Sequence, residues 1–432
     1  MKMANMDDYF DVVIVGTGAA GLYCALNLPA RYRILLLTKQ KADESDSFLA
    51  QGGICMQHGE ADYRPFFDDT MRAGHYENNP ATVELMIRSS NSIIRDLVRR
   101  GVRFARDDHG ALRFTREGAH SRPRILFHED ITGHEITQTL LNEVLRCENI
   151  ELREHTTLLD FFADASACGG VIAAGPDGEP RAIGAGAVVL ACGGIGGLYK
   201  NSTNFPHITG DAIAMALRHG VACEHLDYIQ IHPTTLYSHR KGRRFLISES
   251  VRGEGALLLD KNGNRFTNEL QPRDVVSAAI RAQMEKDSTD CVWEDMRPIG
   301  EAAIREHFPN ILERCEEEGY DPIHEPIPVV PAQHYFMGGI TADLSSRTAL
   351  PRLYACGETC CNGVHGRNRL ASNSLLESLV FAQRAADDIL YGEPPVFTGD
   401  KPDLAPYREQ EPLFAAYRQE VLTAIERSKN HE

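Results

Sequence analysis

Residues 11–21 read Asp-Val-Val-Ile-Val-Gly-Thr-Gly-Ala-Ala-Gly, a continuous apolar run that enters a glycine-rich turn. An apolar helical pattern through Leu22, Ala25 and Leu28 follows, so the segment predicts a strand, a turn and a helix. In that context the first glycine permits the tight turn, the second lets the backbone approach a pyrophosphate, and the third lets the helix pack on the strand. The helix N-terminus then faces the phosphates. We therefore predict a dinucleotide site with contacts from Gly16, Thr17, Gly18, Ala19, Ala20 and Gly21.

The next strand, predicted at residues 32–37, ends in Thr38 and Lys39 rather than in the acid that commonly binds the adenosine ribose. Lys39 is either a solvated strand end or a cation that contacts ribose or adenine edges. The missing acid weakens the case for a nicotinamide cofactor more than the case for a flavin. Further on, Gly52 and Gly53 form either a plain turn or a place where the backbone runs close beneath a flat ring.

Length and composition indicate a globular protein of two domains. The chain has 432 residues, of which 43% are hydrophobic and 25% charged. Its net charge of -16 disfavours a nucleic-acid partner, because binding to a phosphate backbone needs a basic surface. A small anionic substrate stays compatible with this charge, since a few arginines and histidines in one cleft can override the overall sign.

The sequence also indicates a cytoplasmic protein without a membrane span. The apolar run at residues 12–15 is too short for a secretory signal, and the long uncharged stretch 182–199 is too rich in glycine for a membrane helix. The eleven cysteines are scattered, and the cluster of Cys356, Cys360 and Cys361 matches no zinc pattern. We expect reduced, mostly buried thiols and no metal site.

The chain organisation predicts an α/β fold with a discontinuous first domain. Strand and helix signals alternate up to about residue 226, change texture over residues 227–335, and return with the apolar strand at residues 353–355 and the helix after Asn373. We therefore predict a dinucleotide-binding domain at 1–226 and 336–391, an inserted second domain at 227–335, and a proline-rich linker with one terminal helix at 392–432.

Histidines and arginines recur next to glycine and proline turns. They lie in His232-Pro-Thr234, Arg252-Gly-Glu254, Arg273-Asp274, His334 to Gly339 and His365 to Ser372. Each alone is more readily a surface ion pair or a helix cap, and Ser372 and Ser374 are placed to cap a helix. Because an arginine fork matches a carboxylate, several in one cleft indicate a dicarboxylic acid. No metal-binding helix motif and no G-x-S-x-G nucleophile motif is present.

Together these motifs resemble the fumarate reductase/succinate dehydrogenase flavoprotein superfamily, and most specifically its L-aspartate oxidase family. The resemblance covers residues 11–390. It implies a Rossmann-type FAD-binding domain interrupted by an inserted α+β capping domain that closes over the flavin. The motifs that carry it are Ala50-Gln-Gly-Gly53, Arg116-Glu-Gly-Ala-His-Ser121, His232-Pro-Thr234, Arg252-Gly-Glu-Gly255, Pro272-Arg-Asp274 and Asn373-Ser-Leu-Leu-Glu377.

The resemblance also implies the site residues. Besides the glycine turn, the expected FAD contacts are Lys39, Ser47, Phe48, Ala50, Gln51, Gly52, Gly53, Asp211, Glu358, Ser374 and Leu375. The expected substrate-binding residues are His232, His334, Arg369, Ser248, Glu249 and Glu117, the last beside the substrate amine. The expected catalytic residues are Arg273, Glu117, His232, His334 and Arg369. Arg273 resembles the proton donor of the fumarate-reducing direction, a role for which it needs an acidic neighbour.

Two positions bear on the reaction. Succinate dehydrogenases carry a flavin-linked histidine five residues before the glutamine of the Gln-Gly-Gly motif; here that residue is Asp46, which implies non-covalent FAD. Glu117 suits a substrate ammonium and not plain succinate, because an unpaired carboxylate facing a dianion is unfavourable. The alternatives are a fumarate reductase without amine specificity and a flavin subunit that docks an iron–sulfur partner.

The implied reaction is oxidation of L-aspartate to iminosuccinate, with the Cα hydrogen passing as hydride to flavin N5. Oxygen, giving hydrogen peroxide, or fumarate, giving succinate, would reoxidise the flavin. Iminosuccinate would pass to quinolinate synthase, a possible partner, for de novo NAD biosynthesis. Longer family members carry a C-terminal helical domain, of which we expect only a short remnant after Leu390.

Overall fold

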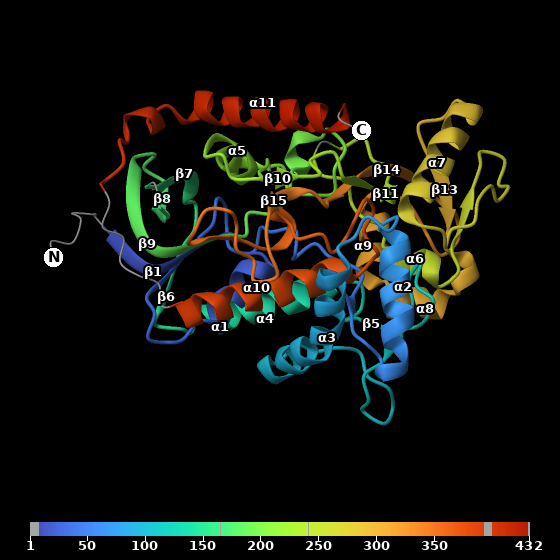
Figure 1. Ribbon diagram of the computed structural model, residues 1–432. Helices are drawn as coiled ribbons and strands as arrows, with labels where there is room; N and C mark the ends of the chain where they lie inside the picture. Colours follow the sequence, from blue (N-terminus) through green and yellow to red (C-terminus); the bar gives the residue numbers. More distant parts are fainter. Residues whose placement is uncertain (1–7, 165, 241, 393–399, 431–432) are drawn as a thin grey trace.

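The structure, a computed structural model, describes residues 8–164, 166–240, 242–392 and 400–430. Its larger part is a seven-stranded sheet with helices on both faces, and a smaller part built on a four-stranded sheet lies at one end (Figure 1). The start of the predicted proline-rich linker, with Pro394 and Pro395, lies outside the described residues.

The large sheet brings several strand ends to one edge. Its strands are β1 (Asp8–Val15), β2 (Ile34–Leu37), β6 (Ile150–Arg153), β7 (Thr157–Ala163), β8 (Cys168–Ala174), β9 (Pro180–Leu190) and β16 (Leu353–Ala355). β6, β2, β1, β9 and β16 are parallel neighbours in that order, while β7 and β8 continue the sheet antiparallel from the start of β9. In such sheets ligands bind outside the carboxyl ends of the parallel strands.

Alternate residues of β1 face opposite sides of the sheet, and both sides are covered. Val12 and Ile14 pack into one apolar cluster, and Val13 and Val15 pack into another. The first cluster contains α1 (Ala19–Asn27), α3 (Pro80–Arg100), α4 (Thr132–Val144) and α10 (Asn373–Gly392); the second contains α5 (Asp211–Arg218) and α11 (Gln410–Lys429). Burial on both faces explains why the strand reads as an unbroken apolar run.

The smaller part, which we call the cap, has its own sheet and core. Its strands are β11 (Ile229–Leu236), β12 (Leu257–Leu259), β13 (Val292–Asp295) and β14 (Ile327–Phe336), paired antiparallel in the order β11, β14, β13, β12. Its helices are α6 (Glu249–Gly253), α7 (Arg273–Asp287), α8 (Glu301–His307) and α9 (Pro309–Glu317). A separate apolar cluster, including Ile280 and Ile327, fills the space between them.

Short elements join the two parts. One three-stranded sheet contains β3 (Ile54–Cys55), β5 (Ile125–Leu126) and β4 (Phe114–Thr115), and another contains β10 (Cys223–Glu224), β15 (Gly339–Thr341) and β17 (Cys360–Cys361). α2 (Tyr63–Ala73) lies beside the cap in Figure 1. The irregular segment between β4 and β5 contains the Arg116 to Ser121 motif, and its Glu117 and His120 side chains are buried.

The predicted fold class is confirmed: an α/β part is interrupted in the sequence by a second, α+β unit. Two strand starts differ from the apolar runs of the sequence: β2 begins at Ile34 rather than at residue 32, and β9 begins at Pro180, well before the unbroken apolar run at residues 187–191. Two polar positions, Pro180 and Arg181, and two glycines, Gly184 and Gly186, interrupt the apolar pattern at the start of β9. The domain boundaries stay predictions; β14 runs to Phe336, one residue past the predicted end of the inserted domain. The predicted terminal helix is α11, whose Tyr417 hydroxyl donates to the Leu159 carbonyl at 2.7 Å.

Candidate active site

A large cavity runs from the carboxyl ends of the parallel strands to the cap. It brings together nearly all of the predicted site residues, although they are spread over more than three hundred positions of sequence. Those that line it are Gly16, Thr17, Gly18, Ala20, Lys39, Ser47, Phe48, Ala50, Gln51, Gly52, Gly53, Glu117, Asp211, His232, Ser248, Glu249, Arg273, His334, Glu358, Arg369, Ser374 and Leu375. Two predicted FAD contacts, Ala19 and Gly21, are not among the lining residues.

At one end of the cavity the glycine turn has the form that a pyrophosphate needs. Gly16 has a φ of +112°, which side chains disfavour, and Gly18 begins α1 without a side-chain cap. The start of the helix is therefore free to bind an anion, apart from the Ala19 N–H, which donates to Ser47 Oγ at 3.0 Å. A Cβ on Gly21 would lie 1.9 Å from the Gly16 carbonyl oxygen. Gly21 thus serves helix packing, as the spacing predicted.

Lys39 is paired. Its ammonium lies 2.7 Å from Asp211 Oδ2 and donates to the His207 carbonyl at 3.1 Å. The Lys39 side chain is partly exposed, lines the cavity and binds the first residue of α5, and its contact with a ribose or adenine edge stays a prediction. An acid therefore does stand near the end of β2, but α5 supplies it.

Protein atoms also lie close to Gly52 and Gly53. A Cβ on Gly53 would lie 2.3 Å from the Leu126 carbonyl oxygen of β5, and a Cβ on Gly52 would lie 2.5 Å from Glu117 Oε1. Gly53 therefore needs glycine because of the β5 backbone, whereas a Cβ at Gly52 would displace the end of the Glu117 side chain. The backbone here lies on the cavity wall, so a flat ring can also approach it.

Two half-buried carboxyls, Asp46 and Glu358, face the same cavity. Burial raises the pKa of Asp46 to about 7 and that of Glu358 to about 8. Glu358 Oε1 accepts the Phe336 N–H at 2.9 Å, and Asp46 Oδ1 accepts the Phe205 N–H at 2.9 Å. Asp46 Oδ2 has no partner among the described residues, so a donor from a bound molecule suits it.

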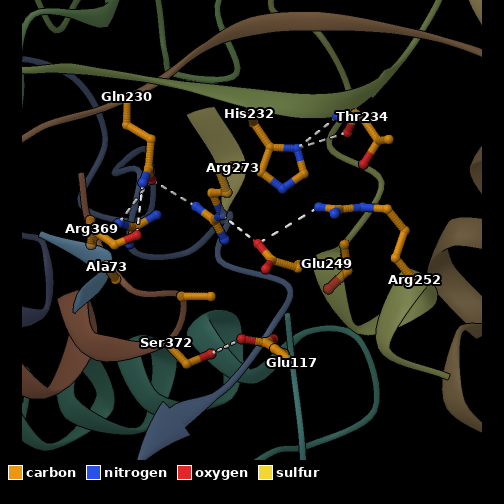
Figure 2. A network of polar contacts seen from close by, with 12 residues as sticks. Ala73, Glu117, Gln230, His232, Thr234, Glu249, Arg252, Arg273, Arg369 and Ser372 are labelled. Atoms are coloured by element: carbon orange, nitrogen blue, oxygen red, sulfur yellow. Dashed lines mark hydrogen bonds and ion pairs between the residues drawn. The ribbon is translucent and has the colours of Figure 1, made fainter. Parts of the chain in front are cut away.

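At the cap end two arginines converge on one amide (Figure 2). Arg273 Nη1 donates to Gln230 Oε1 at 2.8 Å, and Arg369 Nε donates to the same oxygen at 3.2 Å. Arg369 also donates to Ser374 Oγ and stacks over the Tyr335 ring, 4.1 Å from its centroid. Burial and Arg273 lower the pKa of Arg369 to about 10, which leaves it charged at neutral pH. The two guanidinium groups make this end of the cavity strongly cationic.

Two histidines, both neutral, lie beside the arginines at the same end of the cavity. Burial, together with the nearby arginines, holds the pKa of His232 and of His334 well below the ordinary value. His334 Nδ1 lies 2.7 Å from the Thr203 hydroxyl, and His232 Nδ1 lies 3.0 Å from the Thr234 carbonyl oxygen and 3.2 Å from the Thr234 N–H. In the tautomer whose Nδ1 accepts a hydrogen bond, Nε2 of each ring carries the hydrogen. The buried Nε2 of His232 has no partner within the described chain and suits a carboxylate oxygen.

Two glutamates lie in this cationic region, and their pKa values are shifted in opposite directions. Glu249 lies 2.5 Å from Arg273 Nε and 3.7 Å from Arg252 Nη2. Burial alone would raise the pKa of Glu249, but the two arginines lower it below its ordinary value. Glu117 accepts hydroxyl hydrogen bonds from Ser372 at 2.6 Å and Ser250 at 2.9 Å. Burial, and then the charge of Glu249, raise the pKa of Glu117. Their environments therefore shift the two carboxyl pKa values in opposite directions.

Three residues of this network were not predicted as site residues, and Ser372, predicted as a helix cap, instead donates to Glu117 and accepts the Gly53 N–H. Gln230 is two positions before His232 on β11, so strand alternation could have placed both on one face. Ser250 and Ser372 carry no comparable signal, because their partner Glu117 is far away in the sequence. The predicted acidic neighbour of Arg273 is Glu249, which the sequence had assigned to substrate binding only.

The described residues contain neither a metal-binding cluster nor a membrane-spanning helix. Among the described residues, no group of three or more His, Cys, Asp or Glu side chains is placed to hold a metal ion. Within the same ranges, no helix is both long and apolar enough to cross a membrane. The eleven cysteines, all of them in the described part of the chain, are free.

The cavity, the glycine turn and the cap define an FAD-dependent oxidoreductase, and comparison with known proteins agrees. The family described as FAD binding domain matches residues 11–375. A variant of E. coli quinol fumarate reductase FrdA superposes with a TM-score of 0.84 at 31% identity, over 95% of this chain and 74% of that chain. Mycobacterium smegmatis Sdh1 superposes with a TM-score of 0.78 at 30% identity, over 94% and 72%.

The similarity is higher to a narrower group. L-aspartate oxidase of Clostridium perfringens is 48% identical over 380 residues, which are 88% of this chain and 86% of that protein. L-aspartate oxidase of Clostridium acetobutylicum is 47% identical over 380 residues, 88% and 87% of the two chains. The chain belongs to the L-aspartate oxidase family of FAD-dependent oxidoreductases, and FAD is its cofactor.

Proposed function

We propose that this protein oxidises L-aspartate to iminosuccinate with non-covalently bound FAD, in the cytoplasm. The observation that carries the proposal is a buried carboxylate, Glu117, beside a cationic region suited to a dicarboxylate. A cavity for succinate or fumarate alone gains nothing from such a carboxylate, whereas the ammonium of aspartate pairs with it. Asp46, at the position of the flavin-linked histidine in succinate dehydrogenases, supports non-covalent binding.

Substrate binding follows from the charges at the cap end. Arg369, with the Nε2–H groups of His232 and His334, supplies donors for the two carboxylates of aspartate. Because Arg369 and His232 are buried and all three side chains are held by protein partners, they lose little freedom when the ligand arrives. They hold Cα in one orientation. Such positioning lowers the activation barrier, because the entropic cost of orienting the substrate is met on binding.

Oxidation removes a hydride from Cα and a proton from nitrogen. FAD, when bound by the residues named above, supplies the acceptor for the hydride. Glu117 binds the ammonium and accepts the nitrogen proton, a role that its raised pKa favours. Arg273 keeps a positive charge near Cα. In the fumarate-reducing direction it donates a proton, and the ionised Glu249, 2.5 Å away, relays a proton from solvent to replace it.

The electrons leave to one of two acceptors. We propose that oxygen takes them to give hydrogen peroxide, or that fumarate takes them to give succinate. Fumarate has the same two carboxylates as aspartate, so the same arginines and histidines bind it. The iminosuccinate would serve quinolinate synthase as the first step of de novo NAD biosynthesis.

The test is the absorption spectrum of the purified protein under nitrogen, before and after L-aspartate, D-aspartate or succinate is added. We expect a yellow protein that only L-aspartate bleaches. Bleaching by succinate and not by L-aspartate would refute the amine role of Glu117 and indicate a fumarate reductase. An iron chromophore that co-purifies would indicate a flavin subunit of a larger electron-transfer complex.

A further inference from the structure

The cap touches the amine-recognising carboxylate through one hydroxyl. Ser250 lies on α6 of the cap, and its Oγ donates to Glu117 Oε1 at 2.9 Å. The other oxygen of Glu117 accepts the Ser372 hydroxyl at 2.6 Å, from the part of the chain that leads into α10. One donor therefore comes from each half of the protein.

The position of Ser250 is closely defined. Its N–H donates to Ser248 Oγ at 3.2 Å, which caps α6 and fixes the first turn of the helix. α6 also lies directly against the segment that carries Glu117. A Cβ on Gly253 would lie 2.7 Å from the Arg116 carbonyl oxygen, and a Cβ on Gly118 would lie 2.5 Å from Glu249 Oε1. These close approaches leave α6 little room to shift relative to the segment of Glu117. The Ser250 hydroxyl is therefore held in place against the Glu117 carboxylate.

Charge makes this hydrogen bond important. Glu117 is 3% exposed and faces a second carboxylate, Glu249, while Arg273 is bound to Glu249. A buried carboxylate in such surroundings depends on hydroxyl donors to stay ionised. Without Ser250, one of the oxygens of Glu117 loses its donor, and the carboxylate is also free to rotate away from the substrate nitrogen.

We propose that Ser250 is a positioning residue for amine recognition, which orients the Glu117 carboxylate for the substrate ammonium only when the cap is seated on the flavin half. This inference rests on the proposed role of Glu117. A dicarboxylate without an amine does not use the contact. Amine selectivity therefore depends on the seated cap, whereas carboxylate binding depends on the arginines and histidines.

The experiment compares Ser250→Ala with Ser250→Thr, which keeps the hydroxyl. The matched control is Ser238→Ala, because Ser238 is also in the cap and donates to a glutamate, Glu318, at 2.9 Å, outside the cavity. Each variant is assayed with FAD bound, for L-aspartate oxidation across pH and for fumarate reduction by a reduced dye.

For Ser250→Ala we expect kcat/KM for L-aspartate to fall about tenfold, which is about 1.4 kcal/mol. The acid limb of its pH profile should move to higher pH, because loss of a donor to the carboxylate raises its pKa. Fumarate reduction should change less than twofold. Ser250→Thr and Ser238→Ala should match the unmodified protein in both reactions. Equal losses for aspartate and fumarate, or a Thr variant as impaired as the Ala variant, would overturn the inference.

A double-mutant cycle separates this inference from the function on which it rests. If Ser250 acts through Glu117, Ser250→Ala should have almost no further effect in a Glu117→Gln background. Additive effects would overturn the role of Ser250 while leaving that of Glu117 intact. A Glu117→Gln variant that loses both reactions equally would instead refute the proposed function.

Discussion

The most informative perturbation is Glu117→Gln, which removes one charge and keeps the shape of the side chain. In the structure this carboxylate is 3% exposed and held by hydroxyls at 2.6 and 2.9 Å. A glutamine amide can keep a hydrogen bond with each hydroxyl, so we expect the variant to fold and to bind FAD. What it loses is the attraction for the substrate ammonium.

The size of that loss follows from the burial. Two unit charges 4 Å apart attract by about 4 kcal/mol at an effective dielectric constant of 20. Desolvation of the ammonium offsets part of this, and hydrogen bonds to charged groups contribute about 1.5–3 kcal/mol net. We therefore expect kcat/KM for L-aspartate to fall by about 2–4 kcal/mol, roughly 30- to 900-fold. Fumarate has no ammonium, so its reduction should change less than about threefold, which is under 1 kcal/mol.

The assay is anaerobic bleaching of the flavin by L-aspartate in a stopped-flow instrument, with fumarate reduction by a reduced dye as the second reaction. Burial, and then Glu249, raise the pKa of Glu117, so aspartate oxidation should rise with pH as this carboxyl loses its proton. That limb should vanish in the variant. The matched control is Glu318→Gln, whose carboxylate also accepts a serine hydroxyl but lies outside the cavity. Equal losses in the two reactions, or a pH limb that persists, would refute the reasoning.

Three other changes test the rest of the site and the fold. Arg273→Leu should keep the yellow cofactor yet lose at least about a hundredfold in turnover, as is typical when one charge-stabilising donor is removed; a colourless variant would mean that the arginine is structural. Gly21→Ala should abolish FAD retention, because its Cβ would lie 1.9 Å from the Gly16 carbonyl oxygen, whereas Gly175→Ala has no atom closer than 3.8 Å and should be yellow. Arg124→Met should lower stability by about 3–5 kcal/mol, since buried Asp62 loses its arginine partner and buried Asp69 keeps only Arg72; an unchanged thermal midpoint would contradict this.

The local patterns of the sequence predicted the fold class well. The glycine turn after an apolar run is a short-range signal, because strand, turn and helix all lie within about twenty residues. The return of an apolar strand at β16 indicated a discontinuous domain. The strand limits were less accurate where polar residues or glycines stand inside a strand, as at Arg181 and Gly184 in β9. Pairing with β8 places both residues in the strand, whatever their side chains.

For the site, the sequence supplied the chemical groups but not their partners. Arg273, Glu249 and Glu117 could be named from motifs, yet nothing in them showed that Glu249 binds Arg273 or that serines hold Glu117. Lys39 could not be interpreted from its own neighbourhood, since its partner is Asp211.

By itself, then, the sequence determined which elements form and which residue types are available, because helix and strand periodicity and turn chemistry act over a few residues. Only the tertiary structure decided which side chains meet. Sheet order brings β1, β9 and β16 together, and the seated cap brings Arg273 and Ser250 onto the loop of Glu117. The charge state of each group in the cavity depends on these long-range contacts and on burial, and neither of these can be read from neighbouring residues in the chain.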